Sequence, residues 1–235
     1  MPLPLATYRL QFQPQFGFAQ AARIVPYLDA LGISHVYASP IFRARPGSPH
    51  GYDGVDPNAL NPELGSAAQW EALVDRLQTR AMGWIQDIVP NHMAFDADNR
   101  MLADLFETGP DSPFGEYFDI CWDHPGKGLQ GRLMAPFLGR PYQACRDDGE
   151  IQLRIGADGI AVTYGDLRFP LKIAAYAGVL EAAGAAIDQA VGAADPARRQ
   201  WFGLLDGLSR RQPEAGRLQP SIEALKQSLW GLYNG

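Results

Sequence analysis

Three polar side chains stand at the end of an apolar run in GWIQDIVPNH, residues 83–92. Asp87 lies inside the run, and Asn91 and His92 follow it. A carboxylate in a buried strand is costly unless it is paired, so Asp87 is expected to hold neighbouring donors or to act directly. The amide and the imidazole can donate hydrogen bonds to the hydroxyls of a ligand. The alternative is that Asp87 caps loop amides and His92 is a core histidine.

A second group of polar residues lies in SPHGYDGVDPNALNPELG, residues 48–65. Gly51 allows the backbone to approach a neighbour or a ligand closely. Tyr52 offers a flat apolar face with a polar tip, which suits stacking on a sugar ring or a base. Asp53 offers acceptors for hydroxyls, and further acceptors follow at Asp56, Asn58 and Asn61. The alternative is that these Asp and Asn residues form only Asx-turns within a long loop.

Several other kinds of site find no support. There is no Walker loop, and no G-x-G-x-x-G follows a strand, so phosphate or dinucleotide binding is not expected. The four histidines lack the H-E-x-x-H and H-x-H spacings of metal sites. Asp87, His92 and His50 are the set that a metal would use, but scattered Asp and His residues are usually not ligands. We therefore predict neither a metal nor a cofactor.

Alternating strand and helix patterns position these residues. Period-two or apolar runs predict strands at 6–12, 33–42 and 84–89. Helical spacing predicts helices at 18–32 and 66–83. Two consecutive βαβ units imply parallel strands with right-handed crossovers, so the carboxyl ends of the strands share one face. In a βα-barrel that face carries the active site.

Three details qualify this pattern. Pro26 falls inside the first helix, where an interior proline costs about 3 kcal/mol, so we expect a kink or a short helix before it. Ser66 and Gln69 form a capping box that opens the second helix. From Pro40 to Asn61 the chain shows no periodicity, and long structureless loops in compact domains are usually functional.

The pattern changes after His92. Residues 93–175 are irregular, and 150–171 reads as two strands joined at an Asp-Gly turn. CRDDGE, residues 145–150, reads as a turn. From about residue 173 the chain is predicted to be helical, with one helix starting at Asp195–Pro196 and the last running from Ser221 to Tyr233. We therefore divide the chain into residues 1–92, an insertion at 93–175 and a helical segment at 176–235.

Composition excludes some classes of partner. The chain is 46% hydrophobic and 20% charged, with a net charge of −6. An acidic chain without a basic run gives no reason to expect nucleic acid or an anionic membrane. We see neither a signal peptide nor an apolar run that could span a bilayer. Cys121 and Cys145 are too few for a disulfide framework, which favours reduced thiols in the cytoplasm.

The motifs carry a resemblance. DIVPNH (87–92) resembles the third-strand motif of the α-amylase-type glycoside hydrolases and transglycosylases. The run YASPIFRARPGSPHGYDGVDPNALNPELG (37–65) is similar to one branch in particular, the maltooligosyltrehalose synthases, as are LGRPY (138–142) and LRFPL (167–171). The resemblance implies an α/β fold: about three strands from the N-terminal part of a TIM (β/α)8 barrel, with an irregular insertion after strand three and a C-terminal helical segment.

The resemblance also implies an activity. It is an isomerase reaction of trehalose biosynthesis, in which the α-1,4 bond to the reducing-end glucose of a maltodextrin becomes an α,α-1,1 bond. Retention of configuration would follow from two displacements through a carboxylate-bound glycosyl intermediate. The implied substrate is therefore a maltooligosaccharide.

Residue roles follow from the same resemblance. Tyr52 would be the stacking platform for the reacting sugar, and His92 would bond its primary hydroxyl. Asp53 would contact substrate or hold the loop, while Asp87 and Asn91 would support the strand end. The expected substrate-binding residues are Tyr52, Asp53, His92, Asn91 and His50. Cys121 stands where this branch is expected to have an acid, although Asp119 and Asp123 flank it.

The carboxylates of this family are not found in the sequence. No Gly-x-Arg-x-Asp-His occurs, and the only barrel strands expected are the first three, so no catalytic residue is assigned and strand four is expected beyond Gly235. We therefore expect the chain to be inactive alone, marginally stable or aggregation-prone, and dependent on the missing C-terminal part of the barrel. Two alternatives stay open: a non-catalytic carbohydrate-binding or assembly fragment of a split barrel, and another amylase-type transferase or hydrolase.

Overall fold

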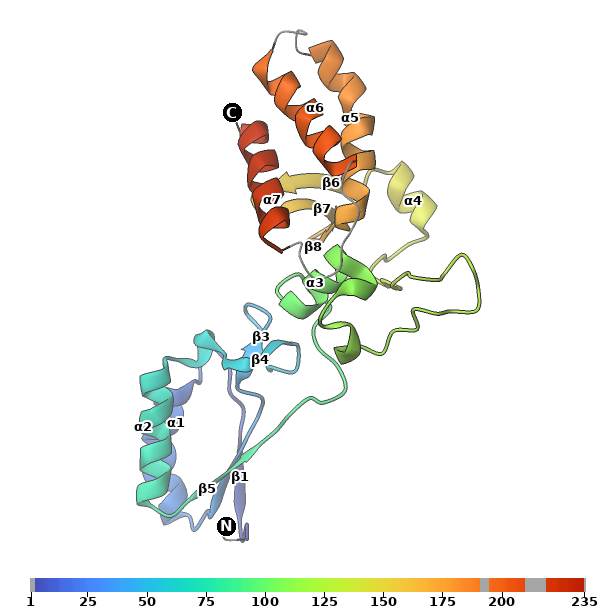
Figure 1. Cartoon of the computed structure of the whole chain (residues 1–235). Helices are drawn as coiled ribbons and strands as arrows, with labels where there is room; N and C mark the ends of the chain where they lie inside the picture. The colour runs from blue at the N-terminus through green and yellow to red at the C-terminus, as the bar shows by residue number, and fades with distance from the viewer. Residues whose placement is uncertain (1–2, 191–194, 210–218, 235) are drawn as a thin grey trace. The chain divides into compact units, whose positions relative to one another are not determined.

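The chain forms two compact units, Met1–Arg100 and Met101–Gly235. The computed structural model, drawn in Figure 1, describes residues 3–190, 195–209 and 219–234. The expected division at residues 92 and 175 into barrel, insertion and helical segments stays a prediction.

The first unit contains a three-stranded parallel sheet in the order β1-β2-β5. Its strands are β1 (Thr7–Leu10), β2 (His35–Ala38) and β5 (Gly83–Gln86). Helices α1 (Phe18–Ala30) and α2 (Ala67–Thr79) connect them, and Figure 1 shows both helices on the same side of the sheet. The prediction of two parallel βαβ units is therefore confirmed. One face of the sheet is covered by helices, as in the wall of a barrel.

An aromatic cluster fills the space between the sheet and the helices. The ring of Phe12 lies 5.9 Å from Phe18 and 5.8 Å from Trp84, measured between centroids. Trp70 of α2 meets Phe18 and Trp84 edge-on at 5.3 and 5.0 Å. Edge-to-face aromatic pairs add about 0.5–1.5 kcal/mol each beyond the area that they bury. These contacts hold the two helices against the strands.

Helix α1 passes through Pro26 without ending, so the expected short helix before this residue is wrong. Proline has no N–H and leaves the carbonyl four residues earlier, that of Ala22, without its helical donor. Arg76 of α2 supplies a replacement, because its Nη1 donates to the Ala22 oxygen at 3.0 Å. A donor from the neighbouring helix therefore offsets part of the cost of the proline.

The capping box at the start of α2 is confirmed. The Ser66 hydroxyl accepts from the Gln69 N–H at 3.3 Å, and the Gln69 side chain accepts from the Ser66 N–H at 2.9 Å. These two bonds satisfy donors that the first helical turn would leave without partners. Helix α2 then ends at Thr79, earlier than the predicted residue 83.

All three strands are shorter than predicted. The run 84–89 does not stay in the sheet: β5 ends at Gln86, and Ile88 is 61% exposed. The last ladder bond runs from the Asp87 N–H to the Ala38 carbonyl at 3.0 Å. Asp87 is consequently half-buried just past the strand and not inside it, which is a correction to the sequence prediction.

The connection from Pro40 to Asn61 is not structureless, contrary to the sequence prediction. It contains β3 (Phe42–Ala44) and β4 (Gly54–Leu60), paired antiparallel with register shifts. Those shifts break the period-two pattern, which explains the lack of a strand signal in this stretch. A short 3-10 helix, Pro62–Leu64, returns the chain to α2.

The second unit begins with irregular chain that includes helices not predicted from the sequence. Helix α3 spans Arg100–Thr108, and two 3-10 turns follow at Gly109–Asp111 and Gly115–Tyr117. The segment 145–150, predicted as a turn, is helical in its first half, because α4 covers Tyr142–Asp147, and forms a turn at residues 148–149.

Three antiparallel strands follow, where the sequence predicts two. They are β6 (Ile151–Gly156), β7 (Gly159–Tyr164) and β8 (Leu167–Pro170), in the order β6-β7-β8. The predicted hairpin at the Asp-Gly pair is confirmed, since Gly156 pairs with Gly159 across the turn. The prediction missed β8 because its four residues are too few to show a period.

The helical C-terminal part is confirmed. After a 3-10 turn at Ile173–Ala175 come α5 (Tyr176–Ala190), α6 (Pro196–Ser209) and α7 (Gln219–Asn234). Helix α6 starts at Pro196 as predicted, and α7 starts two residues before the expected Ser221. The core of this unit consists of buried residues from β7, α5 and α7: Ile160, Tyr176, Leu180, Leu225 and Leu229.

Two buried polar contacts join the elements of this core. The Tyr176 hydroxyl accepts from the Ile160 N–H at 2.8 Å, and burial raises the pKa of Tyr176 to about 12. Lys226 of α7 donates to Glu107 of α3 at 2.6 Å, with both side chains largely buried. Burial raises the pKa of Glu107, and the lysine opposes that shift.

Among the described residues, no helix has the length and apolar character needed to cross a membrane.

The contact between Arg76 and Ala22 generates a first prediction. Replacing Arg76 with methionine should lower the free energy of opening of α1 by about 1–2 kcal/mol, because the Ala22 carbonyl loses its donor. In a Pro26→Ala background the same change should cost less than half as much, since an alanine at this position supplies the missing backbone N–H. Hydrogen exchange of the α1 amides measures both values.

Arg23→Met is the matched control, because Arg23 is an exposed arginine on α1 outside this contact. It should leave the free energy of opening of α1, measured by hydrogen exchange, within about 0.5 kcal/mol of the value for the original chain. An equal cost for Arg76→Met with and without Pro26 would contradict the compensation.

Candidate functional site

The carboxyl ends of the three parallel strands hold a cluster of hydrogen-bonded polar side chains. Asp87 follows β5, Tyr37 lies on β2, and Tyr52 comes from the loop between β3 and β4. The Tyr52 hydroxyl donates to Asp87 Oδ2 at 2.5 Å, and the Tyr37 hydroxyl donates to the same oxygen at 3.2 Å. The carboxylate of Asp87 thus accepts hydrogen bonds from two phenols, and these bonds stabilise its half-buried charge.

Arg9 of β1 completes this cluster. Its Nη2 donates to the Tyr52 hydroxyl at 3.0 Å, and its Nη1 donates to Gln11 Oε1 at 3.0 Å. The guanidinium carbon also lies 5.6 Å from the centroid of the Tyr37 ring. A cation over a phenol face is attracted by the ring quadrupole. The cluster therefore runs from Arg9 through Tyr52 to Asp87.

The charges on either side of Tyr52 act on its acidity. The hydrogen bond to Asp87 raises the pKa of Tyr52, because the carboxylate favours the phenol that still carries its proton. Partial burial adds to the rise, and Arg9 opposes it. The pKa of Arg9 is raised in turn, chiefly by its bond to Tyr52. At neutral pH Tyr52 therefore remains a neutral donor toward Asp87.

The loop before Tyr52 is organised around Asp53. The Ser48 hydroxyl donates to Asp53 Oδ1 at 2.5 Å, and the Gly51 N–H donates to the Ser48 oxygen at 3.1 Å. Gly51 has a φ of +77°, and a Cβ there would lie 2.7 Å from the Pro40 carbonyl oxygen. A side chain is therefore excluded at this position, which fits the close backbone approach expected from the sequence.

His50 lies within this loop, two residues before Tyr52. The Tyr52 N–H donates to His50 Nδ1 at 3.0 Å, so Nδ1 carries a lone pair. That nitrogen also lies 3.8 Å from Asp53 Oδ1. His50 and Tyr52 also face each other as rings, with centroids 6.0 Å apart.

Asn91 and His92 are exposed and interact with each other. His92 Nδ1 lies 3.0 Å from Asn91 Oδ1, and neither residue bonds to Tyr52, Asp53 or Asp87. Asn91 and His92 are thus not hydrogen-bonded to the cluster, and their polar groups face solvent. The idea that His92 is a core histidine is wrong, because the residue is exposed.

The Asx-turn alternative is confirmed for part of the loop. Asp56 Oδ1 accepts from the Asn58 N–H at 2.9 Å, and Asn61 Oδ1 caps the following 3-10 helix through the Glu63 N–H at 3.0 Å. These side chains are engaged by their own backbone. They are therefore not part of the cluster.

Sequence reasoning missed Arg9, Gln11 and Tyr37. The signal was present in part, because Arg9 and Gln11 alternate with apolar residues in TYRLQF and so share one face of the strand. Tyr37 gave no separate signal within an apolar strand. The two free cysteines lie elsewhere, with Cys121 exposed and Cys145 buried.

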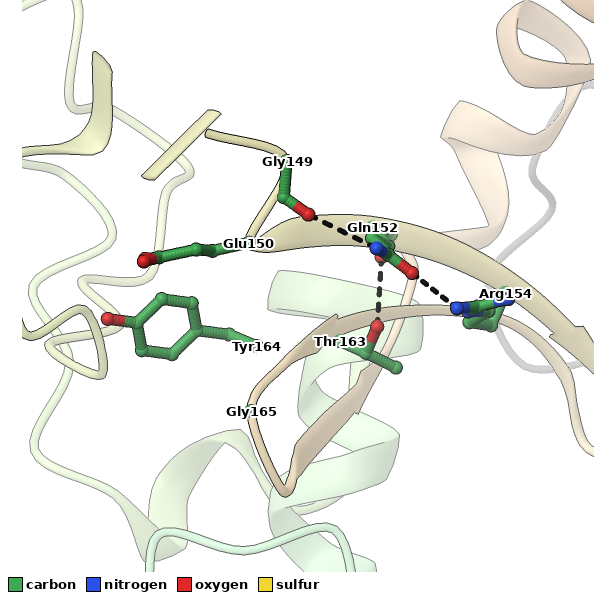
Figure 2. Close-up of a pocket in the computed structure, with 7 residues that line it drawn as sticks. All are labelled: Gly149, Glu150, Gln152, Arg154, Thr163, Tyr164 and Gly165. Carbon is green, nitrogen blue, oxygen red and sulfur yellow. Dashed lines mark hydrogen bonds between the residues drawn. The ribbon is translucent and has the colours of Figure 1, made fainter. Parts of the chain in front are cut away.

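An open hollow lies in the second unit. It has a volume of about 740 Å³ and is lined by residues at the β6–β7 hairpin: Gly149, Glu150, Gln152, Arg154, Thr163, Tyr164 and Gly165. Figure 2 shows Glu150 and Tyr164 projecting in the same direction, while Gln152 is bonded to its neighbours. None of the predicted site residues lines it, so we place the candidate site at the strand ends of the first unit.

The described residues contain no group of three His, Cys, Asp or Glu side chains arranged to hold a metal ion. The three residues that a metal would use are engaged in other contacts, since Asp87 bonds to tyrosines, His50 accepts a backbone N–H and His92 lies against Asn91. That no metal or cofactor is needed stays a prediction.

Comparison with known proteins adds an independent finding. The family model for the α-amylase catalytic domain matches residues 22–140. A putative maltooligosyl trehalose synthase of Mycobacterium tuberculosis is 37% identical over 174 residues, which cover 71% of this chain and 21% of that protein. An oligo-1,6-glucosidase of Halalkalibacterium halodurans is 33% identical over 101 residues, or 43% of this chain and 17% of that protein.

Solved structures of maltooligosyltrehalose synthases are also similar to this chain. A maltooligosyl trehalose synthase structure matches with a TM-score of 0.66 and 34% identity, over 72% of this chain and 22% of the other. The maltooligosyltrehalose synthase of Arthrobacter ramosus matches with a TM-score of 0.60 and 36% identity, over 72% and 21%. This chain spans about a fifth of the length of these relatives.

The bond between Tyr52 and Asp87 generates a second prediction. Replacing Asp87 with asparagine should lower the pKa of Tyr52, because the charge that disfavours the phenolate is gone. The pKa of Tyr52 is raised in the folded chain, so Tyr52 adds its full contribution to the free energy of unfolding below its unfolded pKa of about 10. That contribution is lost as the pH rises through the folded pKa. NMR titration of the tyrosine Cζ carbons measures the shift.

Asp56→Asn is the matched control, because Asp56 bonds to its own loop and not to Tyr52. It should leave the Tyr52 titration unchanged. A Tyr52 pKa that stays the same in Asp87→Asn would show that the bond does not form in solution.

Proposed function

This chain belongs to the α-amylase family, and we propose that it serves a maltooligosyltrehalose synthase-type reaction. In that reaction the reducing-end α-1,4 bond of a maltodextrin is isomerised to an α,α-1,1 bond. The 37% identity to a putative maltooligosyl trehalose synthase over 174 residues supports this branch over others in the family. The match to an oligo-1,6-glucosidase extends over 101 residues only.

The observation that carries the proposal is the Arg9–Tyr52–Asp87 cluster at the carboxyl ends of three parallel strands. In TIM barrels that end of the strands carries the active site. A tyrosine ring fixed there by two charged partners is a preorganised surface on which a sugar ring can stack.

The other residues take roles that follow from their surroundings. Asp87 supports the site by holding both tyrosines, and we assign it no direct contact with substrate. Asn91 and His92 are exposed beyond the strand end and are proposed to bond substrate hydroxyls. Asp53 and His50 shape the loop that carries Tyr52, and both are proposed to lie beside the substrate.

Catalytic carboxylates are proposed to lie outside these 235 residues. The sequence contains no Gly-x-Arg-x-Asp-His, and the one Arg-x-Asp run belongs to α4 and the turn after it. Its Asp148 is exposed and accepts from Arg140 Nη2 at 2.7 Å. We therefore propose that residues 1–92 form the first three βα units of a barrel, 93–175 an insertion, and 176–235 a helical segment before strand four.

A partner follows from this proposal. Within the described residues, β1 and β5 each pair with a single neighbour in their sheet, so both outer edges are open. Open edges of a parallel sheet invite pairing or aggregation. We propose that strands from outside these residues cover the edges, and that the 235-residue chain is marginally stable alone. The cytoplasmic location expected from the cysteines remains part of this proposal.

A second candidate is a non-catalytic carbohydrate-binding or assembly module. The absence of the family's carboxylate motifs from the 235 residues favours it. It would bind maltodextrin through the Tyr52 site and leave the sugar unchanged.

The activity of the chain alone is a third prediction. Purified 235-residue chain incubated with maltopentaose should cause no loss of reducing ends, because it has no carboxylate pair with which to form and break a glycosyl intermediate. A full-length maltooligosyltrehalose synthase serves as positive control. Loss of reducing ends without release of glucose would contradict the inactivity, and release of glucose would indicate a hydrolase.

The proposed reaction is tested by a fourth prediction. A chimera in which residues 5–175 replace the matching segment of the Arthrobacter ramosus enzyme should convert maltopentaose to a non-reducing product. Tyr52→Ala in this chimera should lower kcat/KM about 10²-fold, because the sugar loses its platform. Tyr27→Ala, at an exposed tyrosine on α1, is the control and should have little effect. A folded chimera that only hydrolyses the substrate would contradict the proposal.

A further inference from the structure

Arg9 is an arginine whose charge is not used in an ion pair. It lies on β1 with its side chain on the sheet face opposite the aromatic core, and no carboxylate of the described residues comes within ion-pair distance of it. Instead its contacts are the Tyr52 oxygen, the Gln11 amide oxygen and the face of Tyr37. Because all of these partners are neutral, the direction of the guanidinium N–H donors is the property of Arg9 that this site uses.

The contacts of Arg9 define the direction of its donors. The guanidinium is a planar, rigid fork, so fixing Nη1 on Gln11 also fixes where Nη2 points. Gln11 is held in turn, because its Nε2 donates to the His50 carbonyl at 3.3 Å. His50 is two residues from Tyr52, so Arg9 and Gln11 together attach β1 to the loop that carries the tyrosine.

Two partners on the Tyr52 oxygen restrict the ring. A phenol O–H lies in the plane of its ring because the oxygen is conjugated with it. Asp87 takes the proton at 2.5 Å and Arg9 donates to the same oxygen at 3.0 Å. A hydroxyl that donates to a carboxylate is also a better acceptor, so the two bonds strengthen each other. The Tyr52 hydroxyl must donate to Asp87 and accept from Arg9 at the same time, and this requirement sets the plane of the ring.

We propose that Arg9 is a positioning residue that sets the ring plane of Tyr52, and thereby the platform on which the maltodextrin sugar stacks. The role in sugar binding rests on the proposed function, whereas the orientation of Tyr52 by Arg9 does not. Arg9 touches no substrate in this scheme. It acts through the tyrosine, from the first strand of the barrel.

The experiment uses the 235-residue chain and two replacements of Arg9. Arg9→Met keeps the apolar stem and removes all donors, and Arg9→Lys keeps the charge but loses the fork. The first readout is the hydroxyl proton of Tyr52 in NMR spectra, which is protected from exchange while both partners hold the oxygen. The second is the affinity for maltopentaose, followed by the shifts of the Tyr52 ring. Arg23→Met is the control, an exposed arginine outside the cluster.

Arg9→Met is expected to abolish the Tyr52 hydroxyl signal and to weaken maltopentaose binding about 10-fold or more, since misplacement of a binding group by about 1 Å costs up to ~10²-fold. Arg9→Lys should give nearly the same loss, because a single ammonium cannot bond Gln11 and Tyr52 as a planar fork does. Arg23→Met should change neither readout.

Each other outcome has a definite meaning. An unchanged hydroxyl signal and affinity in Arg9→Met overturn the positioning role. Full recovery in Arg9→Lys overturns it as well, because charge alone would then suffice. If the original chain does not bind maltopentaose while Arg9→Met still loses the hydroxyl signal, the proposed function fails and the orientation of Tyr52 by Arg9 stands.

Discussion

A single carboxylate oxygen, Oδ2 of Asp87, holds the functional end of the first unit together. Two phenols donate to it, one from strand β2 and one from a loop that starts far from β5 in the sequence. Without these donors the half-buried charge would be costly, and without the charge the tyrosines would have no common acceptor. The loop, the strands and the candidate binding surface therefore depend on the same interaction.

That interaction is possible because the strands are parallel. Parallel pairing brings the carboxyl ends of β1, β2 and β5 to one edge, so Arg9, Tyr37 and Asp87 meet although their strands are separated by whole helices. Antiparallel pairing would send alternate ends to opposite edges. The aromatic cluster of Phe12, Phe18, Trp70 and Trp84 and the bond from Arg76 to Ala22 serve this arrangement by holding both helices on one face.

The second unit is stabilised differently. Its antiparallel strands β6, β7 and β8 and its helices share a core that includes buried polar groups. The Glu107–Lys226 pair and the Tyr176 hydroxyl are satisfied within it, as buried polar groups must be. The open hollow beside β6 and β7 is lined largely by side chains engaged in local contacts. The antiparallel sheet of this unit does not gather the carboxyl ends of its strands at one edge, as the sheet of the first unit does.

Elements with local signals could be predicted from the amino-acid sequence. The two βαβ units, the capping box at Ser66, the hairpin at Asp158–Gly159 and the helix at Pro196 each depend on residues a few positions apart. The motifs also singled out Tyr52 in the loop 48–65 and Asp87 in the run 84–89, and they pointed to the α-amylase family, to which the chain belongs.

Which side chains meet became clear only in the folded chain. Tyr52 bonds to a residue 35 positions away and Arg9 to one 43 positions away, and no periodicity encodes such pairs. The same limit explains Pro26, whose helix continues because an arginine 54 positions from Ala22 reaches its carbonyl, and β3 and β4, whose bulged pairing erases the alternation. Local patterns fix backbone conformation within an element, whereas contacts between distant side chains exist only after the chain has folded.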